Sequence, residues 1–232
     1  MSTKRYIRQT QLKEFGEEKQ QLLLQSKVLV IGAGGLGCPV LMYLASSGVG
    51  TIGIIDFDVV DETNLHRQPI YKTNDIGKNK AQLAAAFCNE QNPVITCHTY
   101  VEEFTESNAL NLVNGYDIVV DCSDNFTTRY LVNDVCVQQH IPFVSGSIEG
   151  WEGQVSVFNY LNGPTYRCLY PTPPVDTVTC NDAGVIGALP GVIGSIMALE
   201  AIKVLTKIGD VLSGKLLLVN QLTQAYYTIN FN

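Results

Sequence analysis

A glycine-rich turn between an apolar strand and an apolar helical segment constrains this chain more than any other feature. The turn, Gly32-Ala33-Gly34-Gly35-Leu36-Gly37, follows the mainly apolar run at 27–31 and leads into a helical segment from Cys38. Closely spaced glycines let backbone N–H groups approach a phosphate at the positive end of a helix. We therefore expect a nucleotide site on this turn. The glycines concerned are Gly32, Gly34, Gly35 and Gly37.

Composition limits the classes of protein that remain. The 232 residues are 46% hydrophobic and 16% charged, which suits one domain with a sizeable core. A formal net charge of −7 argues against a nucleic-acid or membrane-surface partner, both of which favour a basic face. No apolar run reaches the roughly 20 residues of a membrane span, and the N-terminus opens no signal-peptide stretch, so a cytoplasmic protein is expected. The seven cysteines form no Cys-x-x-Cys pair and indicate reduced thiols.

From residue 27 onward, apolar strands alternate with longer mixed segments. This alternation predicts an α/β fold, a Rossmann-like doubly wound and mainly parallel sheet. One domain over 1–232 is expected, made of a helical arm (1–26), a nucleotide-binding core (27–150) and a crossover with C-terminal strands (151–232). The strands expected in the core are 28–31, 51–56, 95–100, 118–122 and 143–147, with helices at 36–47, 78–89, 107–113 and 126–139.

The two ends of the chain differ from this core. Residues 8–25 are predicted to form one amphipathic helix ahead of the first strand. Residues 153–160 alternate like a half-buried strand, and the irregular stretch at 161–183 is a crossover of the long kind that is usually functional or mobile. The remaining expected elements are a helix at 185–205 and an antiparallel extension of two strands, 215–220 and 225–230.

Polar residues after the second strand narrow the nucleotide class. Asp56 ends that strand near the offset from Gly32 at which dinucleotide folds hold ribose hydroxyls, so an NAD-dependent oxidoreductase is one alternative. Beyond it the chain turns cationic, which suits a triphosphate and a pyrophosphate leaving group better than a nicotinamide. A solvated helix start at 78–80 is the other interpretation. The cations are Arg67, Lys72, Lys78 and Lys80.

A further cluster, Asp121-Cys122-Ser123-Asp124-Asn125, ends the fourth expected strand. Ligands of open α/β sheets bind at such strand ends, and a carboxylate there can hold Mg²⁺ on phosphates. Asp124 is therefore a candidate magnesium ligand. Its alternative role is to cap the helix that starts near Phe126.

Taken together, these motifs closely resemble the ThiF/MoeB/HesA family, relatives of the ubiquitin-activating enzymes. The resemblance runs from about Tyr6 to the end of the chain. It implies an adenylyltransferase that uses MgATP to activate the C-terminal glycine carboxylate of a small ubiquitin-like sulfur carrier, with release of pyrophosphate. The matching motifs are Arg8-Gln9, 32–37, Asp56, Asn64-Leu65-His66-Arg67-Gln68, Lys80 and 121–125.

The resemblance also implies roles residue by residue. Asp56 would contact the ribose, Asp124 would hold magnesium, and Arg8 would reach the ATP of the other subunit in a homodimer. Asn64, Arg67 and Lys80 would contact the triphosphate. A carboxylate is already a nucleophile, so acyl-adenylate formation needs alignment and charge neutralisation and no general base. Arg8, Arg67, Lys80 and Asp124 are thus the expected catalytic residues.

The partners implied are a carrier ending in Gly-Gly and a sulfurtransferase or cysteine desulfurase that supplies sulfur. We favour a ThiS-type carrier of thiamin thiazole synthesis, with a MoaD-type carrier of molybdopterin synthesis as the alternative. From other classes, an NAD-dependent oxidoreductase or a non-catalytic ATP-binding module stays open.

Cys180 matches a cysteine that in some relatives joins covalently to the activated carrier or relays sulfur. Its place just before the expected helix at 185–205 would favour the thiolate. The alternative is a cysteine that the reaction does not need.

The sequence departs from the family at its structural zinc, which relatives bind with two Cys-x-x-Cys pairs. Thr165 stands where the first pair needs a cysteine beside Cys168, and no second pair precedes Asn232. One thiolate cannot complete a tetrahedral zinc site, so no structural zinc is expected. Elemental analysis of the purified protein should find less than stoichiometric zinc, and one tightly held zinc per chain would contradict this.

Overall fold

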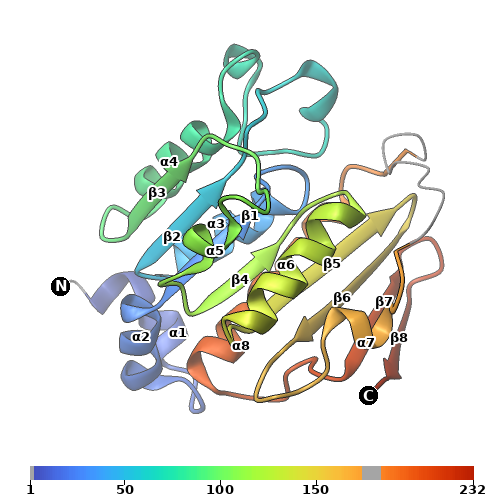
Figure 1. Ribbon diagram of the computed structural model, residues 1–232. Helices are drawn as coiled ribbons and strands as arrows, with labels where there is room; N and C mark the ends of the chain where they lie inside the picture. Colours follow the sequence, from blue (N-terminus) through green and yellow to red (C-terminus); the bar gives the residue numbers. More distant parts are fainter. Residues whose placement is uncertain (1–2, 174–183) are drawn as a thin grey trace.

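The computed structural model describes residues 3–173 and 184–232 of the chain. One eight-stranded sheet runs through the molecule with helices on both of its faces (Figure 1). Its strands are β1 (Lys27–Ile31), β2 (Thr51–Ile55), β3 (Thr96–Tyr100), β4 (Ile118–Asp121), β5 (Phe143–Glu149), β6 (Glu152–Phe158), β7 (Lys215–Asn220) and β8 (Ala225–Asn230). The expected α/β, doubly wound architecture is confirmed.

The strand order in the sheet is β3-β2-β1-β4-β5-β6-β7-β8. The pairs among β1 to β5 are parallel, and those from β5 to β8 are antiparallel. The chain reverses its direction of winding between β1 and β4. Ligands of open α/β sheets bind outside the carboxyl ends of the strands at such a reversal.

The helices cover the sheet in two layers. In Figure 1, α5 and α6 lie in front of the sheet, with α3 and α8 behind it. Helices α1 and α2 lie at the lower end of the sheet, opposite the segment between β2 and α4 at the upper end. The helices are α1 (Ile7–Thr10), α2 (Gly16–Gln25), α3 (Gly37–Ser47), α4 (Lys80–Gln91), α5 (Ala109–Val113), α6 (Phe126–Gln138), α7 (Tyr166–Leu169) and α8 (Leu189–Thr206), with short 3-10 turns at Thr3–Tyr6, Glu62–Asn64 and Thr73–Asp75.

Each face of the sheet has its own hydrophobic core. Strands β1 and β4 are buried on both faces, as parallel strands between two helix layers must be. Aliphatic side chains dominate the core beneath α3, α4 and α8. The core on the other face contains an aromatic cluster, in which the rings of Phe143, Tyr166 and Phe231 lie within 5.9 Å of the Phe158 ring, centroid to centroid.

Among the described residues, one helix, α8, is long and apolar enough to span a membrane, with a mean hydropathy of 1.5 over 18 residues. In the fold, 56% of this segment is buried. It packs along α3 and against β5 and β6. Its apolar side chains thus form part of the hydrophobic core between the sheet and the helices behind it.

The structure corrects three expected elements. The single helix at 8–25 is divided into α1 and α2, because the intervening residues turn and Gly16 adopts a φ of +61°. The crossover contains a short helix, α7, that the sequence pattern did not reveal. Helix α8 begins at Leu189 and not at 185, because Val185 bridges to Gly150 and Ile186 N–H donates to the Gly150 carbonyl.

The aromatic core gives a prediction of stability. Phe158 is 2% exposed at the centre of that core, so Phe158→Ala should lower the free energy of unfolding by about 3–5 kcal/mol through lost burial and a cavity. Tyr227→Ala, on exposed strand β8, is the control and should cost less than about 1 kcal/mol. Urea unfolding measures both, and equal costs would contradict the assignment of Phe158 to the core.

Candidate active site

The glycine turn lies where the winding of the sheet reverses, between the end of β1 and the start of α3. Gly32 has a φ of +91°, and a Cβ there would lie 3.0 Å from the carbonyl oxygen of Cys122, which follows β4. A Cβ on Gly37 would collide with the carbonyl oxygen of Gly32. These two glycines are therefore required by the close crossing of the chain itself.

Gly34 and Gly35 are different. A Cβ on Gly34 would meet only Gln68 Nε2, at 3.6 Å, and one on Gly35 would meet Pro190 at 3.4 Å, both ordinary contacts. The fold leaves room for side chains at these two positions. Packing does not require glycine at these positions, but the absence of a side chain allows a phosphate to approach the backbone N–H groups closely.

Asp56 joins the glycine turn to the end of β2. Its carboxylate accepts hydrogen bonds from the backbone N–H groups of Ala33 and Asp58, each at 2.8 Å. Burial raises the pKa of Asp56, and those two hydrogen bonds and Lys80 oppose the rise. Tyr71 secures the same turn by donating its hydroxyl to the Ala33 carbonyl at 2.7 Å.

The four cations of the predicted cluster take different positions. The Lys80 ammonium is buried at the start of α4 and pairs with the Asp58 carboxylate at 2.9 Å. Arg67 is half-buried and donates to the Thr63 carbonyl at 2.9 Å. Lys78 makes a surface ion pair with Asp75, and Lys72 is exposed. Lys80 and Arg67 therefore lie at the site, whereas Lys78 and Lys72 lie on the protein surface.

The segment with Arg67 lies directly against the glycine turn. A Cβ on Gly35 would lie 3.7 Å from Arg67 Cδ. Asn64 ends a short 3-10 turn beside it, is half-buried, and accepts the backbone N–H of Arg67 at 3.0 Å through its own carbonyl. The structure thus brings Asn64, Arg67 and Lys80 to the same strand ends as the turn.

The end of β4 excludes the helix-capping role considered for Asp124 and leaves its magnesium role as a prediction. Asn125, and not Asp124, caps α6 by accepting the Thr128 N–H at 2.8 Å. Asp124 is exposed, and its carboxylate makes no ion pair within residues 3–173 and 184–232. No group of three or more metal-binding side chains gathers in that described part. A single free carboxylate still fits Mg²⁺, which takes its other ligands from phosphates and water.

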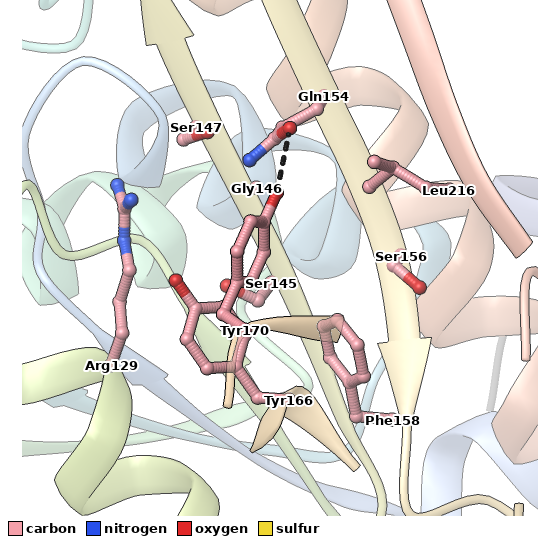
Figure 2. Close-up of a pocket in the computed structure, with 10 residues that line it drawn as sticks. All are labelled: Arg129, Ser145, Gly146, Ser147, Gln154, Ser156, Phe158, Tyr166, Tyr170 and Leu216. Atoms are coloured by element: carbon pink, nitrogen blue, oxygen red, sulfur yellow. Dashed lines mark hydrogen bonds between the residues drawn. The ribbon is translucent and has the colours of Figure 1, made fainter. Parts of the chain in front are cut away.

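A buried arginine near Asp124 is a feature that the sequence analysis missed. Arg129, on α6, is 5% exposed and donates to the Ser123 carbonyl at 3.0 Å, while its Nε–H has no partner among the described residues. Figure 2 shows its side chain along one side of a small pocket, with Tyr166 and Tyr170 below and beside it. Such an unpaired buried donor is able to bind a polar ligand group. No residue spacing indicates this pocket, since β5, β6, α6 and α7 each contribute to it.

The remaining predicted residues lie elsewhere. Arg8 is exposed on α1, at the end of the sheet opposite the glycine turn (Figure 1). Cys180 lies outside the described residues. Cys168 is exposed, and hydrogen bonds from Thr165 lower the pKa of its thiol.

A sequence model of the ThiF family matches residues 6–232, nearly the whole chain. The chain belongs to the ThiF family. Among relatives of this ThiF chain, the adenylyltransferase and sulfurtransferase MOCS3 of Dictyostelium discoideum is 50% identical over 97% of the chain and 54% of the relative. The adenylyltransferase and sulfurtransferase UBA4 of Meyerozyma guilliermondii is 51% identical over 88% of the chain and 49% of the relative. The chain spans about half the length of these relatives.

Solved structures share the ThiF fold of this chain. Escherichia coli MccB with ATP superposes with a TM-score of 0.85 at 23% identity, over 100% of this chain and 72% of MccB. MccB with MccA-N7isoASN gives a TM-score of 0.88 at 22% identity, over the same shares. At such low identity the likeness concerns the fold.

The buried charge at Asp56 gives a prediction about pH. Because its pKa in the folded chain is raised above the ordinary value of 3.8, the folded state binds this proton more tightly than the unfolded state. The stability that Asp56 contributes is therefore present below pH 3.8 and is lost as the pH rises through the pKa that Asp56 has in the folded chain. The Asp56→Asn variant has no carboxyl group to ionise, so it does not lose stability in this way. Its stability relative to wild type should increase between about pH 3 and 7 in urea unfolding, and a relative decrease would contradict the burial argument.

Proposed function

We propose that this chain is an adenylyltransferase that activates the C-terminal carboxylate of a ubiquitin-like carrier with ATP. The observation that carries the proposal is the convergence of the glycine turn, Lys80, Arg67 and Asp124 at the carboxyl ends of β1, β2 and β4. Relatives named adenylyltransferases support it over an NAD-dependent oxidoreductase.

In the proposed reaction a carboxylate oxygen of the carrier attacks the α-phosphorus of ATP. The new O–P bond forms as the bond to the bridging oxygen breaks, and pyrophosphate leaves with that electron pair. Bare N–H groups at Gly34 and Gly35 would hold phosphate oxygens, with Asp56 on the ribose and Asn64 beside the triphosphate. Mg²⁺ held by Asp124 would neutralise phosphate charge.

Lys80 has the buried position that this chemistry needs. Its ammonium is paired with Asp58, whose carboxylate is half exposed at the surface of the site. A triphosphate offers several negative oxygens to the same ammonium, so it would compete with or share this pair. Arg67 supplies a second cation, and the two would stabilise the charge that develops on the leaving pyrophosphate.

For the carrier, we favour a MoaD-type protein over the ThiS-type protein expected from sequence. The support is that the relatives, at about 50% sequence identity, are MOCS3 and UBA4 proteins. Their names also include a sulfurtransferase, which suits a carrier that goes on to receive sulfur. The pocket beside Arg129 would receive the carrier's tail, because an extended peptide presents carbonyl oxygens to an unused N–H donor.

We further propose a homodimer in which Arg8 reaches the nucleotide of the second copy. Arg8 lies on the arm at the far ends of α3 and α4, whose first residues, Gly37 and Lys80, are at the nucleotide site. The 11 residues of α3 separate these two ends by about 15 Å. Arg8 is thus placed away from its own site, as an action in trans requires.

Exchange of labelled pyrophosphate into ATP tests the function. Wild-type protein with MgATP and a MoaD-type carrier ending in Gly-Gly should exchange label, whereas Asp124→Ala should lower the rate at least about 100-fold. Asp210→Ala, an exposed acid beyond α8, is the matched control and should exchange like wild type.

Two results would count against the proposal. Exchange with none of the MoaD-type and ThiS-type carriers would refute adenylation. Faster exchange with the ThiS-type carrier would refute only the choice of carrier.

A further inference from the structure

Residues 3–10, the first part of the helical arm and called the N-terminal arm below, are fixed to the rest of the molecule. Their side chains donate hydrogen bonds to the last carbonyls of two helices. The last carbonyls of a helix have no partner inside it. Arg5 donates to the Gln91 carbonyl at the end of α4, at 2.8 Å, and Gln9 donates to the Ser47 carbonyl at the end of α3, at 3.1 Å. Both helices begin at the candidate active site.

Tyr6 is the buried anchor of this arm. Only 7% of Tyr6 is exposed, and its hydroxyl accepts a hydrogen bond of 2.8 Å from the side-chain amide of Asn92, which is fully buried. The same Asn92 amide donates to the Ala45 carbonyl near the end of α3, at 2.7 Å. The ring lies so close to Gly48 that a Cβ there would approach it to 2.7 Å.

Gln9 forms a second attachment one helical turn further on. Its amide donates to Gln20 Oε1 at 2.6 Å, and Gln20 in turn donates to the Ser47 carbonyl at 3.0 Å. Gln20 is 4% exposed on α2, so this pair joins α1, α2 and α3. Between the two attachments, Ile7 and Arg8 are exposed.

We propose that Tyr6 and Gln9 are positioning residues that present Arg8 to the nucleotide site of a second copy of this chain. The inference rests on the proposed function, because it assumes that Arg8 acts in trans. Side chains held on both sides of Arg8 restrict the arm to one orientation, so the guanidinium loses little freedom when it meets a triphosphate. The competing explanation is that the arm only stabilises α3 and α4 of its own chain.

Heterodimers of two inactive variants separate these explanations. Arg8→Ala leaves a chain with an intact nucleotide site, and Asp124→Ala leaves a chain with an intact arm. The two are co-expressed with different tags and purified together. Because each heterodimer has one complete site, it should exchange pyrophosphate at about half the wild-type rate.

The pair Tyr6→Phe and Gln9→Ala is then added to one chain at a time. In the Asp124→Ala chain, which supplies the arm, it should lower the exchange rate of the heterodimer about tenfold through the lost attachments. In the Arg8→Ala chain, which supplies the site, it should leave the rate as it was. A role confined to stabilising α3 and α4 would give the opposite dependence.

Three outcomes would overturn the positioning role: an equal loss in both chains, a loss only in the chain that supplies the site, or no loss in either. Thermal unfolding of each heterodimer checks that the double variant folds, and Tyr6→Phe alone replaces it if it does not. Failure of wild-type protein to exchange would refute the proposed function itself. Wild-type exchange with an inactive heterodimer would refute only the presentation of Arg8 in trans.

Discussion

The hydrogen bond from Ala33 N–H to the Asp56 carboxylate is the interaction on which the candidate site depends. It ties the turn after β1 to the end of β2, while Gly32 packs against Cys122 at the end of β4. Three strand ends are thereby held in one arrangement. The cationic segment that follows β2 then has a fixed surface to lie on, and Arg67 and Lys80 come to the glycine turn from there.

Holding charge at these strand ends opposes stability. Burial raises the pKa of Asp56 and also that of Asp121, which accepts hydrogen bonds from Ser123 and Ser145 beneath the site. Ionised carboxylates are costly to bury unless they are hydrogen-bonded, as both of these are. The aliphatic and aromatic cores on the two faces of the sheet supply the stability that allows such a site.

Helices α3 and α4 connect the site with the N-terminal arm. Their first turns carry Gly37 and Lys80, and their last carbonyls accept hydrogen bonds from Gln9 and Arg5 of the arm. The same two helices thus run from the candidate site at one end to the arm at the other. A rigid helix keeps the candidate site and the arm a fixed distance apart.

From the sequence alone we could predict the alternation of strands and helices, the glycine turn, and two of the four cations at the site, Arg67 and Lys80, because periodicity and turn chemistry are local. The sequence could not divide 8–25 into α1 and α2, or show that Asn125 caps α6 in place of Asp124. The packing of distant elements was needed to show that Lys80 pairs with Asp58 while Lys78 lies at the surface. It was also needed to show that Arg129 is buried with its Nε–H unpaired among the described residues. The reason is physical: burial and pairing depend on which distant strands and helices meet, and no local pattern records that.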